Sequence, residues 1–342
     1  MNDANISKSS TCVSLPEKSF SCDSLDTLAQ LGTNDHFNRS GDDDFDVVSA
    51  TEKSDKKSLK KRARRKYLTS GYIGALVDAA KTNDASSLTK SYWSTYHCAK
   101  TLVLTSDGKV SGKYCKNRWC LVCNSIRTAQ LINKYQPVLD SWDNQYFVTL
   151  TTPNVEACDL REAINVMQGI FVKAKERLKK RAQRGKGEKF KGIRKLEITY
   201  NPLRNDFHPH FHLIIDGKTN ATSLLDDWLK GYNDSFHSTI WGNADMKAQD
   251  IKKVDAGGAM ELFKYFTKVI SGKGKEDRMI YADAMDIIFN SVKGKRVFQP
   301  FGFTVKSELK DKENESDSYV ITEYEWDQFK ADWQGGGYGS RL

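Results

Sequence analysis

Residues 193–215 read IRKLEITYNPLRNDFHPHFHLII, and this stretch decides the fold. The runs Ile193–Tyr200 and His210–Ile215 are rich in β-branched and aromatic residues, which predicts two strands. A short linker over Asn201–Pro209 joins them, so the two strands are expected to form an antiparallel pair.

Two histidines in this stretch form the first candidate site. Successive side chains of a strand point to opposite faces, so His210 and His212 should project together while Phe211 turns to the core. Two imidazoles on one face are a natural metal-binding pair. His208 is a further candidate ligand, although Pro209 disturbs the alternation. The alternative is a set of histidines that bind no metal.

The preceding strand offers a third ligand. Lys195, Glu197 and Thr199 share one face, with apolar residues between them on the other. A carboxylate beside two imidazoles suits Mg²⁺ or Mn²⁺ and leaves positions open for phosphate oxygens. Glu197 could instead be an exposed strand residue without a ligand role.

The segment ELFKYFTK at 261–268 has the pattern of an amphipathic helix. On a helical wheel, one side carries Glu261, Lys264, Tyr265 and Lys268. The opposite side carries the apolar residues Leu262, Phe263, Phe266, Val269 and Ile270. A tyrosine beside lysines and a carboxylate can act as a nucleophile, because nearby cations favour the phenolate. A surface tyrosine on an ordinary amphipathic helix is the alternative.

Four of the seven cysteines, Cys98, Cys115, Cys120 and Cys123, fall within a short stretch. An odd number of cysteines argues against a full disulfide framework, and thiols at this spacing favour a structural zinc ion. His97 is an alternative to Cys98 as the fourth ligand. Buried cysteines without metal are the other interpretation.

Charge is distributed unevenly along the chain. The formal net charge is +9, although residues 1–55 carry −7. The basic remainder favours a polyanionic partner, because neutralising phosphates releases counterions. Eight Lys and Arg residues lie between Lys56 and Lys66, as a DNA-binding arm or a solvated linker end. Arg118 and Trp119 could contact a phosphate and stack on a base, or Trp119 could belong to the core.

The remaining elements follow from periodicity and turn signals. Further strands are expected at 146–152 and 297–305, and helices at 159–184 with Asp159 as cap, 220–233, 257–271 and 280–292. The chain then divides into a disordered acidic region at 1–55, a basic linker or arm at 56–89 and a Cys-rich module at 90–130. A larger domain of predicted strands and helices follows at 131–305, and a C-terminal tail at 306–342 ends in the flexible GGGYGSRL.

The order of FVTLTTPN, LEITYN, HPHFHLII and ELFKYFTK resembles the rolling-circle replication initiators of small Gram-positive-type plasmids, in the HUH endonuclease superfamily. The resemblance covers residues 90–305. It implies an α+β fold with a central antiparallel five-stranded sheet flanked by helices, His210 and His212 on a central strand, and a Cys-rich zinc module.

The resemblance also implies roles. Metal ligands fall on His210, His212 and Glu197, and the nicking nucleophile on Tyr265. Glu261 matches a glutamate that activates water at termination. Lys268 would steady the phosphate or the phenolate.

The expected partners are plasmid DNA, with its double-strand origin and single-stranded nick site, and the host helicase, polymerase and single-strand binding protein. No G-x-x-x-x-G-K-[ST] loop supplies an ATPase. Without an apolar run long enough to span a bilayer or a signal-peptide pattern, a cytoplasmic protein with no membrane partner is expected. A homodimer is left open. The rival interpretations are a relaxase or transposase with the same chemistry, and a non-catalytic zinc-dependent DNA-binding protein.

Overall fold

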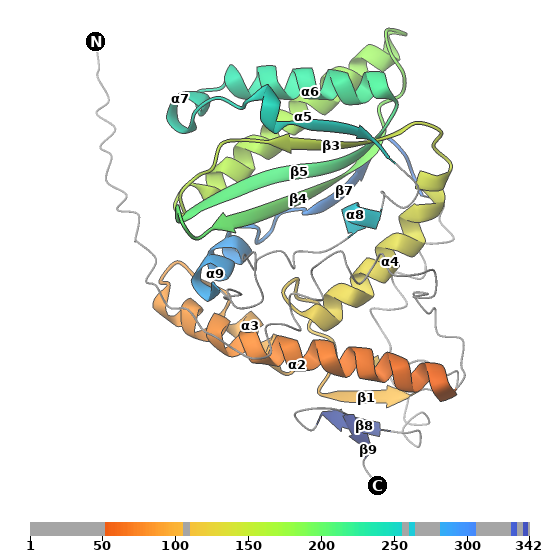
Figure 1. Ribbon diagram of the computed structural model, residues 1–342, viewed down its shortest axis with the longest axis vertical. Coiled ribbons are helices and arrows are strands. Elements are labelled where there is room, and N and C mark those ends of the chain that lie inside the picture. Colours follow the sequence, from red (N-terminus) through yellow and green to blue (C-terminus); the bar gives the residue numbers. More distant parts are fainter. Residues whose placement is uncertain are drawn as a thin grey trace.

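The computed structural model describes residues 52–104, 110–254, 260–263, 281–305, 330–333 and 338–340, and side chains within 61–102, 112–254, 262–263 and 281–305. Its centre is a five-stranded sheet in the order β6-β3-β5-β4-β7 (Figure 1). The strands are β3 (Gln145–Thr151), β4 (Gly192–Asn201), β5 (Asp206–Asp216), β6 (Asp250–Lys253) and β7 (Phe298–Phe301). Every pairing is antiparallel, so the predicted α+β fold with β5 in the middle is confirmed.

The β4–β5 hairpin is longer than the sequence predicts. The prediction of a linker over Asn201–Pro209 is wrong, because β5 already begins at Asp206. Asn201 Oδ1 accepts hydrogen bonds from the amides of Leu203 and Arg204, which closes a tight turn. Pro209 is tolerated because β3 pairs with β5 only from His210 onward, so the strand at Pro209 is ladder-paired on one side.

One face of the sheet is covered by α5 (Leu160–Gln183) and α6 (Lys218–Asn233) (Figure 1). The predicted helical stripe is buried there, with Ile164, Met167, Phe171, Ala174 and Leu178 in the core against Leu196, Phe211 and Leu213. Asp159 occupies the N-cap position but does not cap with its side chain, because its carboxylate accepts a hydrogen bond from Trp241 Nε1. Gly185 follows the helix with φ +69°, a conformation that favours glycine.

The other face carries α4 (Leu121–Asp140) and α8 (Met260–Phe263). The side chains of Leu262 and Phe263 pack with Ile193 and Ile214, which lie opposite each other on β4 and β5. The short elements α7 (Ser238–Trp241) and η2 (Met246–Ala248) connect α6 to β6. Of the helix predicted at 257–271, only α8 lies within the described residues.

Three helices close the lower side of this body, α2 (Glu52–Thr82), α3 (Thr89–Tyr96) and α9 (Ala282–Ser291) (Figure 1). The fully buried carboxylate of Asp286 on α9 accepts hydrogen bonds from Asn83, Ser86 and Tyr92. The basic stretch at 56–66 is therefore part of a helix whose later residues pack into the core. The domain boundaries proposed above remain a prediction. The disorder expected at 1–55 is wrong for residues 52–55, which form the start of α2, and residues 1–51 lie outside the described residues.

A second, four-stranded sheet has the order β2-β1-β8-β9. It joins β1 (Thr101–Leu104) and β2 (Val110–Gly112) to β8 (Lys330–Trp333) and β9 (Tyr338–Ser340). The expectation of a flexible end is wrong for residues 338–340, which pair with β8. In the part of the chain described, no helix has the length and apolar content needed to cross a membrane.

Candidate metal centre

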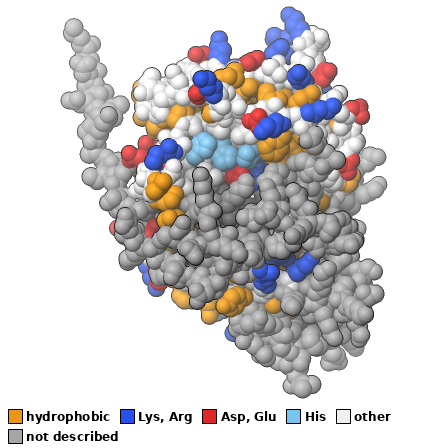
Figure 2. Space-filling view, viewed as in Figure 1, with side chains coloured by type: hydrophobic (Ala, Val, Ile, Leu, Met, Phe, Trp, Pro, Cys, Tyr) orange, Lys and Arg blue, Asp and Glu red, His pale blue; other side chains and the backbone are white. Residues whose placement is uncertain are grey.

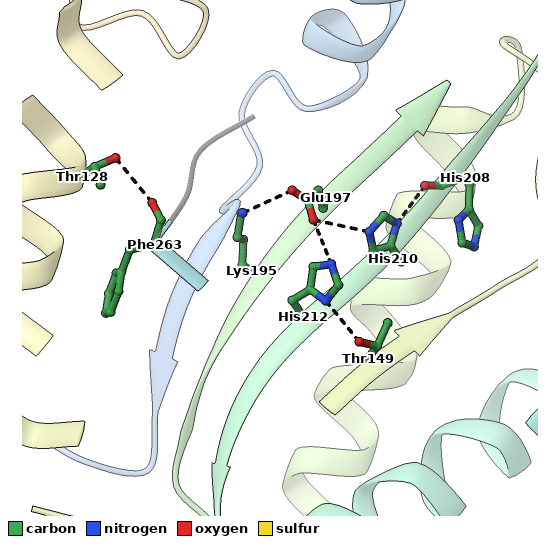
Figure 3. Close-up of polar contacts among 8 residues, drawn as sticks. All are labelled: Thr128, Thr149, Lys195, Glu197, His208, His210, His212 and Phe263. Atoms are coloured by element: carbon green, nitrogen blue, oxygen red, sulfur yellow. Dashed lines mark hydrogen bonds and ion pairs between the residues drawn. The ribbon is translucent and has the colours of Figure 1, made fainter. Parts of the chain in front are cut away.

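Glu197, His210 and His212 meet on the α8 side of the central sheet (Figure 3). Glu197 Oε2 lies 2.8 Å from His212 Nε2 and 3.5 Å from His210 Nε2. One ligand atom from each residue falls within 4.8 Å of the others, so these three side chains could hold a metal ion. Figure 2 shows histidine side chains reaching the surface on this side of the molecule.

Strand alternation and hairpin register bring the three residues together. Glu197 pairs directly with His210, and Lys195 with His212, so all four side chains leave the same face. Phe211, between the histidines, is fully buried on the other face, as predicted. Glu197 and His210 are only 6% and 7% exposed, so Glu197 is not the exposed strand residue considered as an alternative.

Each imidazole is held through its other nitrogen. His210 Nδ1 lies 3.1 Å from the carbonyl oxygen of His208, and His212 Nδ1 lies 3.2 Å from Thr149 Oγ1. A carbonyl can only accept, so His210 carries a proton on Nδ1 and, when neutral, a lone pair on Nε2. That lone pair and the Glu197 carboxylate repel each other unless a proton or a cation lies between them. The donor set therefore fits a divalent cation.

Lys195 is a fourth member of this site that sequence reasoning placed on the correct face but did not assign. Its side chain is almost fully buried, and Nζ lies 3.3 Å from Glu197 Oε1. Burial alone would raise the pKa of Glu197. Hydrogen bonds from His210 and His212, when each carries a proton on Nε2, and the charge of Lys195 hold that pKa well below its ordinary value. Oε1 is thus engaged by the lysine, while Oε2 faces the imidazoles.

His208 lies beside the site without joining it. The ring of His208 stacks on that of His210, with 5.0 Å between the ring centroids. His208 does not belong to the group formed by Glu197, His210 and His212. Burial, with the neighbouring His210, lowers the pKa of His208 to about 4. His208 therefore remains neutral across the neutral pH range and supports the ring of His210.

The predicted nucleophile lies outside the described residues. This holds for Tyr265 and Lys268, and for the side chain of Glu261. The described residues end at Phe263 before this segment: Phe263 packs on Phe298, and its carbonyl accepts a 3.4 Å hydrogen bond from Thr128. The chain therefore enters this segment on the same face of the sheet as the three candidate ligands (Figure 3).

The four cysteines form a second, closed group. Sulfur atoms lie 3.5 Å apart for Cys98 and Cys123, and 3.6 Å apart for the pairs Cys115–Cys123 and Cys98–Cys120. These separations are too long for disulfides. They are close to the edge of about 3.8 Å expected for a tetrahedron of thiolates at 2.3 Å from zinc. The group could hold a metal ion, with Cys98 rather than His97 as its fourth member.

Arg118 and Trp119 have internal partners. Arg118 donates to the carbonyls of Val292 and Lys295, and Trp119 Nε1 donates to Thr95 Oγ1. The indole also contacts the rings of Tyr92 and Phe289. The core role considered for Trp119 is therefore the correct one, and both residues attach the cysteine group to α9.

Fold and site together define a class: an antiparallel-sheet protein with a cation site of two histidines and a glutamate on its central strand, and a four-cysteine group at its side. The chain belongs to the replication protein family (Rep_1), whose model matches residues 109–333.

The chain is also similar to several known proteins. A protein named "Protein rep" from Staphylococcus aureus is 30% identical over 164 residues, 44% of this chain and 66% of that protein. One from Streptococcus pneumoniae serotype 2 is 27% identical over 196 residues, 51% of this chain and 58% of that protein. Another, from a Bacillus species, is 30% identical over 134 residues, 36% of this chain and 42% of that protein. The chain thus spans less than two thirds of the length of these relatives. No solved structure matches it.

Proposed function

We propose that this protein is a plasmid replication initiator that nicks one strand at a double-strand origin and transfers the strand to itself, starting and ending rolling-circle replication. The observation that carries the proposal is the Glu197, His210 and His212 group on the central strand of a replication-family protein. A site with two imidazoles and one carboxylate leaves coordination positions for phosphate oxygens.

Glu197, His210 and His212 would hold Mg²⁺ or Mn²⁺. When bound, the cation supplies polarisation of the scissile phosphate and offsets charge in the transition state. The chain's own residues prepare this place. Lys195 fixes the Glu197 carboxylate through Oε1, so that Oε2 points to the imidazoles. The contacts of His208 and Thr149 hold the two rings in their orientation.

Tyr265 is the proposed nucleophile. Its phenolic oxygen forms a bond to the scissile phosphorus, and the bond from phosphorus to the 3′ oxygen breaks. The phenol loses its proton, and the leaving oxygen gains one to become a free 3′-hydroxyl. The products are a 5′-phosphotyrosine and a primer end for a host polymerase. Support comes from the sequence motif and from α8, which leads into the segment on the face of the ligands.

Glu261 would act at the end of the cycle. As a general base it takes a proton from water, whose oxygen forms a bond to the phosphorus of the regenerated nick site. The bond from that phosphorus to the 3′ oxygen breaks, and the 3′ oxygen gains a proton to become a free hydroxyl. Lys268 would stabilise the phosphate or the phenolate. The four cysteines would hold structural Zn²⁺. The host helicase and single-strand binding protein would open the duplex, in the cytoplasm. Dimerisation is a separate question for solution measurements.

The direct test uses a single-stranded oligonucleotide that carries the origin nick site, with Mn²⁺. Wild-type protein should form a covalent adduct that resists denaturing electrophoresis, and Tyr265→Phe should form none. Tyr96→Phe is the matched control, because Tyr96 is an exposed tyrosine away from the candidate site. An adduct with Tyr265→Phe at the wild-type level would refute the assignment. Nicking of transfer-origin or transposon-end DNA in preference to a plasmid replication origin would favour a relaxase or transposase.

A further inference from the structure

A dense basic surface lies at the far end of α5, away from the candidate metal centre. Seven exposed Lys and Arg side chains there make no ion pair or side-chain hydrogen bond within the described part of the chain. They are Lys173, Lys179, Lys180, Arg181, Arg184, Lys186 and Lys189, here called the α5 basic surface. Figure 2 shows Lys and Arg side chains gathered at the top right, where Figure 1 places this end of α5.

The arrangement is ordered along the helix. Lys173, Arg177, Lys180 and Arg184 are spaced by four, three and four residues, which places them within an arc of about 60°. On the opposite side, Ile164, Phe171 and other apolar residues face the core. At a rise of 1.5 Å per residue, the stripe from Lys173 to Arg184 is about 17 Å long. Duplex DNA presents one phosphate per 1.7 Å of axis, or about ten phosphates over that length.

Helix electrostatics explain only a small part of this charge. Cations in the last turn of a helix are favoured by the helix dipole, and this accounts for Lys180 and Arg181. It does not account for Lys173, two turns earlier, or for Lys186 and Lys189 beyond the helix end. Arg177 is the member of the stripe with a carboxylate partner, Asp227 at 3.0 Å. Mutual repulsion among the others is relieved when they meet a polyanion.

The surface is connected to the candidate metal centre through one strand. The segment that carries Lys186 and Lys189 runs directly into β4, which carries Glu197. Eight residues separate Lys189 from Glu197, an extended length of at most about 28 Å. That span equals about eight base pairs at 3.4 Å each. Because α5 covers the face of the sheet opposite the metal centre, the duplex would lie on the α5 side. The strand to be cut would pass around the sheet to the metal centre.

We infer that the α5 basic surface binds the phosphate backbone of duplex DNA flanking the nick site. The inference rests on the proposed function and deepens it by naming which part of the protein holds the double-stranded part of the origin. Contact with phosphates carries little sequence information, so this surface would set affinity and orientation rather than recognise the origin.

The test is a fourfold variant, Lys173→Gln, Lys180→Gln, Arg184→Gln and Lys186→Gln. Its matched control, with the same change in charge, is Lys90→Gln, Lys100→Gln, Lys113→Gln and Lys247→Gln, all exposed residues outside this surface. Binding is measured by fluorescence anisotropy without divalent metal, from 0.05 to about 0.3 M salt. One probe is the single-stranded nick site, and the other is the same site with a duplex flank.

The α5 variant should lose about a hundredfold in affinity for the duplex-flanked probe at 0.15 M salt, with a salt slope shallower by about three. Its affinity for the single strand should stay near that of the control variant. Equal losses in both variants, or an unchanged slope, would overturn the inference. So would a larger loss of binding to phosphatidylglycerol vesicles than to DNA, which would identify a membrane surface.

The outcome is independent of the cleavage chemistry. Nicking of the single-stranded oligonucleotide should be unchanged in the α5 variant, because the surface contacts only duplex. If wild-type protein fails to nick but the α5 variant still loses duplex affinity, the proposed function fails and this inference stands. If wild-type protein nicks and the α5 variant keeps its duplex affinity, the proposed function stands and this inference fails.

Discussion

Two buried lysines stand beside the two groups of metal-binding side chains, and their surroundings differ. Lys66, 2% exposed, lies near the four cysteines and donates to the carbonyl of Tyr96. Lys195, 4% exposed, contacts Glu197 in the candidate metal centre. Zinc with four thiolates carries a net charge of about −2, which a lysine offsets. A divalent ion with one carboxylate and two neutral imidazoles carries about +1, which a lysine increases.

The difference supports two roles for metal under the proposed function. The cysteine group is closed, with all four donors from protein, and a nearby cation stabilises it. Burial lowers the pKa of Lys66, while the cysteines oppose that shift, as expected for thiolates. The group of Glu197, His210 and His212, here called the triad, has three donors and an excess of positive charge when it holds a divalent ion. This suits an anionic substrate. Structural sites are generally closed, and catalytic sites keep a position open.

The largest expected effect is the loss of a cysteine ligand. Cys120 is fully buried at the start of α4. Cys120→Ser should abolish bound zinc and lower the free energy of unfolding by about 3 kcal/mol or more, because structural zinc binding contributes directly to folding. The zinc content is measured by inductively coupled plasma emission spectrometry. The loss of stability is measured as a shift of the thermal midpoint of unfolding. A wild-type protein without zinc, and a variant with the same midpoint, would contradict the structural role.

Removal of a histidine from the triad should reduce nicking activity and leave the stability of the fold almost unchanged. His212→Ala should reduce nicking by about a thousandfold, because metal polarisation supplies several kcal/mol to such reactions. The thermal midpoint should change little, since His212 is the most exposed of the three ligands. His237→Ala, in a histidine outside the triad, is the control and should nick normally. Equal activity in both variants would remove the triad from the mechanism.

The hairpin that builds this triad could be predicted from sequence, because strand alternation has a fixed period of two. That period predicts His210 and His212 on one face of their strand, and the register of β4 and β5 places Glu197 on the same face. The apolar stripe of α5 was equally predictable, because it repeats at helical spacing. The contact between Lys195 and Glu197 was not, because it depends on how two side chains on the same strand turn toward each other.

Other features depend on long-range pairing. β8 pairs with β1 across more than two hundred residues, and no local pattern marks the two strands as partners. The sequence allows a phosphate contact for Arg118, because it cannot show that carbonyls at the end of α9 accept the hydrogen bonds of this residue. The basic residues up to Lys66 look solvated for the same reason, although Lys66 is buried beside the cysteines.

A smaller effect is expected from the lysines themselves, with opposite signs. Lys195→Met should tighten Mn²⁺ binding several-fold, because it removes a like charge beside the ion, yet reduce nicking about tenfold. Lys66→Met should instead weaken zinc retention against a chelator. Calorimetric titration of metal-free protein with Mn²⁺ measures the first effect, and the rate of zinc release measures the second. If both substitutions strengthen metal binding, or both weaken it, the two lysines do not have the opposite electrostatic effects described above.

The smallest effect should come from His208, which lies outside both metal groups but stacks on His210. Its folded-state pKa of about 4 lies below the ordinary value near 6.5, so the unfolded chain takes up the proton first as pH falls. The contribution to stability is therefore complete above pH 6.5 and is lost progressively between about 6.5 and 4. His208→Gln should make the free energy of unfolding, measured with urea in metal-free buffer, less dependent on pH in that window. An identical pH dependence in wild type and variant would show that the ring of His208 takes up its proton as readily as in the unfolded chain.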